Sequence, residues 1–171
     1  MTWIYDHNTD NSARYTLGPA GEDRLFCFGI NPSTAAPGSL DNTVKSVERI
    51  AHRHGFDAFM MLNVYPQRAT NPDDMHQELD PELHAQNLLH IDQYFTLNPT
   101  KKILAAWGTL IHKRPYLLPC LRDIYEVSRR HDCHWYRIGP FSKAGHPHHP
   151  LYLSNSEMME EFDIEGYISN F

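Results

Sequence analysis

Short apolar runs alternate with amphipathic segments along most of the chain. Four such runs, each as long as a strand that is buried on both faces, lie at residues 25–30, 58–62, 102–107 and 134–138. Between them, apolar residues recur at helical spacing over 41–55 and 81–97, and less regularly, with two prolines, up to residue 130. This alternation predicts an α/β fold: a mainly parallel four-stranded central sheet with helices on both faces, in a three-layer αβα architecture.

Capping signals mark the two regular helices. Asp41 and Asn42 are both N-cap candidates for the first helix, and Gly55 is its stop signal. Pro81 suits the first turn of the second helix. Both amphipathic segments therefore have the start signal that a helix needs.

We expect one domain over residues 1–171, since a chain of this length suits a single core. Its expected parts are a short N-terminal β extension (1–23), an α/β core (24–155) and a C-terminal helix and tail (156–171). In the extension, 3–5 and 13–17 are expected to pair as antiparallel strands around a polar turn. The last helix is expected near 156–162.

Charge and composition narrow the function classes. The formal net charge of −6 argues against strong non-specific DNA binding, because that affinity depends on Lys and Arg neutralising phosphates. No apolar run reaches the ~18 residues of a membrane span, and the start of the chain has no signal-peptide pattern. We therefore expect a cytoplasmic protein with no membrane partner. The three cysteines have no CxxC spacing, which argues against a disulfide framework and a cysteine zinc site.

Candidate chemistry is concentrated where the predicted strands end. Four segments follow the four apolar runs, at 29–33, 62–66, 106–108 and 145–152. In an open parallel sheet the ligand crevice lies outside the carboxyl ends of the strands. The shared placement therefore predicts one site that gathers two Asn amides, at least one His and several aromatic residues.

Two Asn residues carry most of this prediction. Gly29 permits close backbone approach. Asn31 then offers an amide with both donor and acceptor, and Ser33 and Thr34 add hydroxyls. Asn63, at the end of the next run, could read a carbonyl and an adjacent N–H of a planar heterocycle. Each Asn could instead satisfy loop backbone, Asn31 through an Asx turn.

Aromatic and charged residues are further candidates. Tyr65, Phe141 and Trp107 could stack on a planar ligand. A Trp at a strand end is more often core, and Tyr65 on its loop is the better candidate. Asp41 is the first carboxylate after the first loop, within reach of the crevice, or it only caps the helix. Arg68 could hold a phosphate, or only one of the aspartates that follow it.

The histidine-rich loop at 145–152 has two interpretations. A metal site is less favoured, because no carboxylate lies between residues 141 and 152 and the histidines cannot easily converge. A polar recognition or catalytic role is favoured, with His149 or His146 as the functional residue. His149 could donate a hydrogen bond to a developing anion. We therefore expect neither a metal nor another cofactor.

A set of motifs extends over about residues 13–155 and carries a resemblance. The motifs are 29–33, Asp41 with Thr43, Asn63 with Pro66, 68–72, Asn87, Trp107 with Gly108, and 145–153. In these positions the chain resembles the bacterial family called domain of unknown function 1643 (DUF1643). That resemblance implies no settled activity.

Three of these motifs also resemble, more distantly, the uracil-DNA glycosylase superfamily. Residues 29–32 reproduce the Gly-Ile-Asn-Pro motif of its mismatch-specific branch, which implies that Asn31 positions the hydrolytic water. Asn63 is similar to an Asn that reads the pyrimidine edge, and His149 to a late-loop His that stabilises the leaving base. The chain departs from that branch at Ser33, where the branch has Gly, and its late loop lacks a Ser-Pro pair. The resemblance implies a uracil-DNA-glycosylase-like fold.

Two hypotheses from different classes follow. The first is hydrolysis of an N-glycosidic bond in a nucleobase-containing small molecule, or in a single-stranded or damaged nucleic acid. Asn31 would orient water, His149 would hold the departing base and Asp41 would support the sugar cation. The second is a non-catalytic nucleotide- or nucleic-acid-binding protein on the same fold. A nucleotide hydrolase is less favoured, because the chain has no Walker-type glycine loop and no carboxylate cluster for magnesium.

Overall fold

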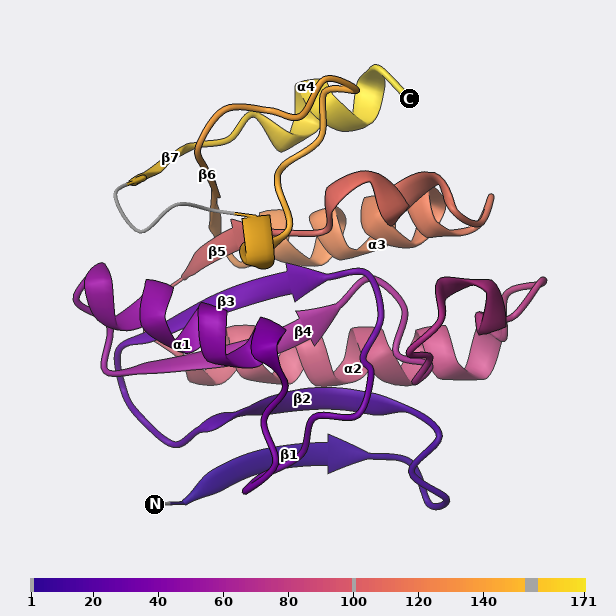
Figure 1. Cartoon of the computed structure of the whole chain (residues 1–171), viewed down its shortest axis with the longest axis horizontal. Coiled ribbons are helices and arrows are strands. Elements are labelled where there is room, and N and C mark those ends of the chain that lie inside the picture. Colours follow the sequence, from indigo (N-terminus) through magenta and orange to yellow (C-terminus); the bar gives the residue numbers. More distant parts are fainter. Residues whose placement is uncertain (1, 100, 153–156) are drawn as a thin grey trace.

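One seven-stranded sheet runs through the computed structural model, which describes residues 2–99, 101–152 and 157–171. In chain order the strands are β1 (Trp3–His7), β2 (Arg14–Pro19), β3 (Arg24–Gly29), β4 (Ala58–Asn63), β5 (Lys102–Ala105), β6 (His134–Ile138) and β7 (Met159–Glu161). Across the sheet their order is β1-β2-β4-β3-β5-β6-β7 (Figure 1).

The sheet is mixed, which corrects the predicted one. The four strands β4, β3, β5 and β6 are parallel, as the four apolar runs predicted. β1, β2 and β7 are antiparallel to their neighbours. The prediction of a four-stranded, mainly parallel sheet was therefore wrong, because the N-terminal pair does not stand apart. It extends the sheet through β2, which pairs with β4.

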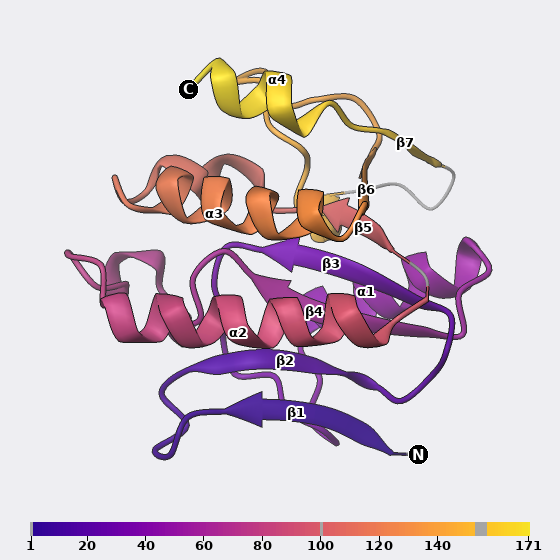
Figure 2. The same cartoon turned by 180° about the vertical axis from the view of Figure 1, so that it is seen from behind.

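Helices cover both faces of the sheet. α1 (Asn42–Arg53) lies on one face, and α2 (Pro81–Leu97) and α3 (Leu117–Arg130) lie on the other, as the front and back views show (Figures 1 and 2). α4 (Ile164–Ser169) packs against α3. The predicted three layers are confirmed. None of the described helices has the length and apolar character that a membrane-spanning segment requires.

Local signals explain where these helices begin. Asp41 caps α1, since its Oδ1 accepts a hydrogen bond from the Val44 N–H at 2.9 Å. Asp80 caps α2 in the same way, and Pro81 occupies the first helical position. Pro119 lies in the first turn of α3, where a backbone N–H has no helical partner to lose. The interruption predicted from the prolines is therefore absent after residue 117.

The connections change direction at β3. From β3 the chain passes through α1 to β4 on one side, and then through α2 to β5 on the other side of β3. The loops that follow β3 and β5 therefore diverge at the carboxyl edge of the sheet. Open α/β sheets bind ligands at such a switch point.

Alternate side chains of the central strands feed two cores. Phe26, Phe28 and Leu62 belong to the core that also contains residues of α2 and α3. Cys27 and Met61 belong to the core that contains residues of α1. This division makes the parallel strands apolar on both faces, which is why they read as continuous apolar runs.

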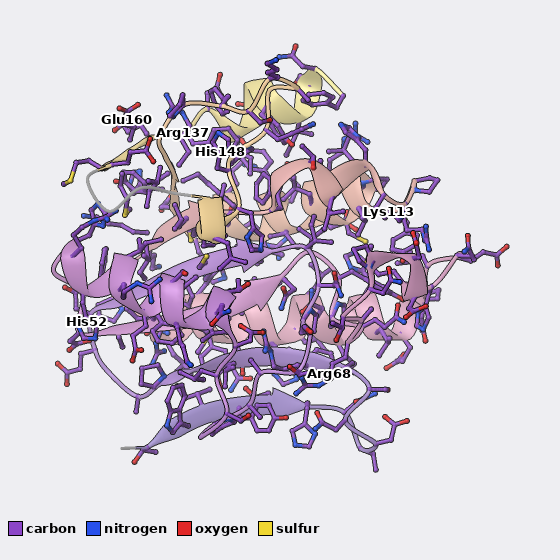
Figure 3. All side chains as sticks on the ribbon, viewed as in Figure 1. His52, Arg68, Lys113, Arg137, His148 and Glu160 are labelled. Atoms are coloured by element: carbon purple, nitrogen blue, oxygen red, sulfur yellow. The ribbon has the colours of Figure 1, made fainter. Side chains whose placement is uncertain are left out.

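The C-terminal segment differs from its prediction. A helix is expected near 156–162, but residues 159–161 form β7 and α4 begins only at Ile164. β7 pairs with β6, and Arg137 of β6 forms an ion pair with Glu160 of β7 at 3.0 Å (Figure 3). Pairing at the sheet edge satisfies backbone groups of β6, an effect that helical periodicity in a short window does not register. Residue 156, where the predicted helix starts, lies outside the described residues.

Candidate functional site

A pocket of about 390 Å³ lies at the carboxyl edge of the sheet, between the ends of β3 and β4 and the start of α1. Seven of the eleven residues proposed from the sequence line it: Gly29, Asn31, Ser33, Asp41, Asn63, Trp107 and His149. Its volume is within the range of small-molecule sites. Thr34, Tyr65, Arg68 and His146 are not part of its lining.

Asn63 is buried in the pocket wall with an unused donor. It ends β4 in register with Gly29 on β3, and its exposed fraction is only 2%. Its Nδ2 is sealed from solvent and makes no hydrogen bond within the described residues. A Cβ on Gly29 would lie 3.2 Å from Asn63 Oδ1, so the glycine leaves room for the amide. Buried amides are nearly always hydrogen-bonded, so this donor is an exception that lies in the pocket wall.

Asn31 is oriented by the loop that faces it. Its Nδ2 donates to the carbonyl oxygens of Ala69 at 2.9 Å and Pro32 at 3.1 Å. In the opposite direction, the Ala69 N–H donates to the Pro32 carbonyl at 2.9 Å. The amide nitrogen of Asn31 is therefore occupied, and Oδ1 is the atom that could accept a hydrogen bond from a ligand or water.

Arg68 holds the Asn31 loop in place from outside the pocket. Its guanidinium donates to the Ser33 carbonyl at 2.6 Å and to the Tyr5 hydroxyl at 2.7 Å, beside β1 and β2 (Figure 3). The suggestion that Arg68 binds a following aspartate is not supported. Asp73 instead contacts Lys113. Arg68 is thus a positioning residue, and Thr34 in the same loop is exposed.

His149 reaches the pocket from the loop after β6. Burial lowers its pKa, and the charge of Asp41 offsets part of that effect, so the imidazole is neutral near pH 7. Its Nδ1 accepts a hydrogen bond from the Leu151 N–H at 3.3 Å, which assigns the ring proton to Nε2. The loop packs on Gly108, where an added Cβ would lie 3.5 Å from the Cβ of His149.

Trp107 and His146 secure that loop rather than a ligand. The indole of Trp107 is buried, and its Nε1–H donates to the Tyr167 hydroxyl at 3.0 Å. That hydroxyl also forms a hydrogen bond of 2.7 Å with His146 Nδ1. His146 is therefore a structural residue, while one edge of Trp107 remains in the pocket wall.

Tyr65 lies in the core behind the site. Its ring is fully buried, and its hydroxyl contacts His76 Nδ1 at 2.6 Å and accepts from the Asp80 N–H at 3.0 Å. This position does not support the stacking role suggested from the sequence. The pocket also holds no metal-type cluster: within the described ranges, no group of three or more His, Cys, Asp or Glu is arranged to bind an ion.

A comparison of the chain with models of protein families matches the region that contributes the pocket residues. The model of the family described as Protein of unknown function (DUF1643) matches residues 14–151. The chain belongs to the DUF1643 family. The matched region begins at Arg14 and ends at Leu151, both of which line the pocket. Among curated proteins and solved structures, no match to the chain was found.

Arg14 lines the pocket of this DUF1643 protein, although the sequence motifs did not identify it as a candidate site residue. It begins β2, lines the pocket and is only 2% exposed. The sequence assigned it to an N-terminal extension, away from the sheet that carries the site. Arg14 shares the polar side of the predicted strand with Thr16, where an arginine is expected to be exposed, so the alternation gave no signal of its burial.

Proposed function

We propose that the pocket binds a nucleobase-containing ligand and hydrolyses its N-glycosidic bond. The observation that carries the proposal is the buried, unpartnered amide of Asn63 in the pocket wall. An amide edge can pair with the adjacent donor and acceptor of a planar base, whereas lysine and arginine only donate. Gly29 keeps the space beside this amide open.

Three other groups would meet the demands of the reaction. Hydrolysis develops positive charge on the sugar and negative charge on the leaving base. Asn31 Oδ1 would orient a water, whose oxygen bonds to the anomeric carbon while the carbon–nitrogen bond breaks and leaves its electron pair on the base. His149 Nε2–H would hydrogen-bond that base, and Asp41 would stabilise the sugar cation. The proton lost by the attacking water passes to the base or to solvent.

The sequence resemblance to the uracil-DNA glycosylase superfamily supports the same roles. It equates Asn31 with a water-positioning Asn and His149 with a His that stabilises the leaving base. Both side chains line one pocket with Asn63. We therefore also propose a relationship in fold to that superfamily.

Base release is the direct test. Purified protein is incubated with nucleosides, nucleotides and oligonucleotides that carry uracil, mismatched or modified bases, and free base is measured by mass spectrometry. We expect release by the native protein and its loss in Asn31→Ala. Thr34→Ala is the matched control, since Thr34 lies in the same loop but is exposed and outside the pocket. Unchanged release by Asn31→Ala would overturn the catalytic assignment.

A non-catalytic binding protein is the second candidate. Two hydrogen bonds favour a binding protein without catalysis, those of Asn31 with Ala69 and of Asp41 with Val44. Both side chains already stabilise the local backbone through these bonds. In that case the same panel would give tight binding, read by thermal shift, without release of any base. Release that depends on Asn31 would exclude it.

A further inference from the structure

Arg14 has donors that the fold does not use. Its Nη1 donates to the Ala35 carbonyl at 3.2 Å. Its Nε is sealed from solvent without a hydrogen-bond partner. Its Nη2 makes no hydrogen bond within residues 2–99, 101–152 and 157–171 and, unlike Nε, is not sealed from solvent. Arg14 is only 2% exposed and lies in the pocket wall. Buried polar groups are nearly always hydrogen-bonded, so its unpartnered donors are available for a ligand.

The charge around Arg14 is also incomplete. The pKa of Arg14 is lowered to about 10, mainly by burial and also by nearby Arg68, while the charge of Asp41 opposes this shift, so the side chain stays protonated at pH 7. Among the described carboxylates, none forms an ion pair with Arg14 or with Arg68. Arg14 thus lies near a second cation, Arg68, and near one carboxylate, Asp41, in a chain whose net charge is −6.

A second buried arginine shows what a purely structural one looks like in this fold. Arg24 is 4% exposed and its Nε is also unpartnered. It donates, however, to three neutral oxygens, those of Asn98, Pro19 and Gly21, at 3.0–3.4 Å. Arg24 does not line the pocket. Burial alone therefore does not distinguish a ligand-binding arginine from a structural one. Arg14 differs from Arg24 because it lines the pocket and because its Nη2 has no hydrogen-bond partner.

The sheet brings Arg14 beside the amide that reads the base. β2 is antiparallel to its neighbour β4, so the first residue of β2 and the last residue of β4, Asn63, lie at the same edge. The Arg14 N–H donates to the Pro66 carbonyl at 3.0 Å, which fixes this approach. Asn42 and Thr43 in the first turn of α1 line the same pocket, so the positive end of that helix faces it.

We propose that Arg14 binds the phosphate of a nucleotide whose base lies against Asn63. This inference rests on the proposed function and deepens it: the substrate is a free nucleotide and not a nucleoside or a polymer. A terminal phosphate can reach a guanidinium that is nearly sealed by protein, whereas a continuous strand would need the backbone to leave the pocket on both sides of that phosphate. The acidic chain as a whole also disfavours a long polyanion.

Binding of matched ligand pairs tests the inference. Calorimetry compares each common nucleoside with its 5′-monophosphate and with a short single-stranded oligonucleotide. We expect the monophosphate of the preferred base to bind the native protein at least about tenfold tighter than its nucleoside, as a charge-assisted pair implies. We expect this advantage to fall below about threefold in Arg14→Gln, and Arg14→Lys to recover part of it. Arg24→Gln is the control that keeps the advantage.

The outcomes separate this inference from the proposed function. Equal affinity for nucleoside and nucleotide in the native protein, tighter binding of the oligonucleotide, or an advantage that survives Arg14→Gln would each overturn the phosphate site. If Arg14→Gln does not fold, the native comparison still decides. Base release from nucleosides with no preference for phosphate would leave the glycosidase standing alone. Phosphate-dependent binding without base release would leave the nucleotide site standing alone.

Discussion

Two buried polar side chains in one pocket have donors that the fold leaves unsatisfied. Asn63 and Arg14 lie on neighbouring strands, and each has a nitrogen that is sealed from water without a partner. An unsatisfied buried polar group costs about 1–3 kcal/mol of folding free energy. Such residues lower stability in the free protein and raise affinity for the molecule that completes them.

Replacing Asn63 therefore separates stability from binding. In Asn63→Ala we expect the free energy of unfolding to change by less than about 1 kcal/mol, because an unsatisfied donor is removed together with the contacts. We expect ligand affinity to fall at least about tenfold, because the base edge loses both of its hydrogen bonds. Urea unfolding and calorimetry measure the two effects. Full affinity in this variant would contradict the role of Asn63.

Asn87 provides the contrasting amide. It is fully buried on α2, and its Nδ2 donates to the backbone carbonyl of Asn63 at 2.9 Å, while its Oδ1 has no partner among the described residues. Asn87→Ala leaves that carbonyl unsatisfied and removes the unpartnered Oδ1, and because the first effect is the larger we expect a loss of about 1 kcal/mol of stability. We therefore expect Asn63→Ala to be the more stable of the two variants and Asn87→Ala to bind the ligand more tightly.

At the scale of elements, a buried hydrogen-bond chain ties the histidine loop to the body of the protein. The chain runs from Trp107 after β5, through Tyr167 on α4, to His146 in the loop. His149 follows three residues later and lines the pocket. α4 thus acts on the site through the loop, although none of its residues lines the pocket.

Removing one hydroxyl tests this connection. Tyr167→Phe leaves Trp107 Nε1 and His146 Nδ1 without their partner, so we expect a loss of about 1–3 kcal/mol of stability. We also expect faster hydrogen exchange in residues 141–151 and weaker ligand binding. Tyr125→Phe is the control, because Tyr125 lies on α3 and interacts with Glu165 of α4, away from the loop. Unchanged exchange in Tyr167→Phe would show that the loop is held by other contacts.

The sequence predicts most elements of this fold and fewer of its pairings. The helix at 41–55 is confirmed with its Asp41 cap, and the strand at 134–138 is confirmed with both of its ends. These elements depend on nearby residues and on periodicity, which a sequence displays directly. The place of β2 beside β4 depends on residues more than forty positions apart, so Arg14 was missed.

The whole molecule should lose stability in mild acid. Burial lowers the pKa of His90, His146 and His149. The unfolded chain therefore takes up protons at these positions below about pH 6.5, while the folded protein resists them. Their contribution is fully present above pH 6.5 and is lost as the pH falls through the lowered values. We expect the free energy of unfolding to decline by up to about 1.4 kcal/mol per pH unit for each group.

Urea unfolding between pH 8 and pH 5 measures this decline. His146→Gln should reduce the slope, since it removes one buried titrating group. His134→Gln should retain it, because His134 is exposed at the start of β6. A free energy of unfolding that stays constant down to pH 5 would contradict the expectation.

The order of the pocket residues along the chain also governs when the pocket can exist during synthesis. Arg14, Asn31 and Asn63 leave the ribosome before His149 and before Tyr167 of α4, which anchors the loop of His149 through His146. A nascent chain that stops before His149 has Asn63 and Arg14 without the loop that completes the pocket wall. A ligand stabilises only the form that binds it, so bound nucleotide would protect completed chains from proteolysis and give truncated chains no protection.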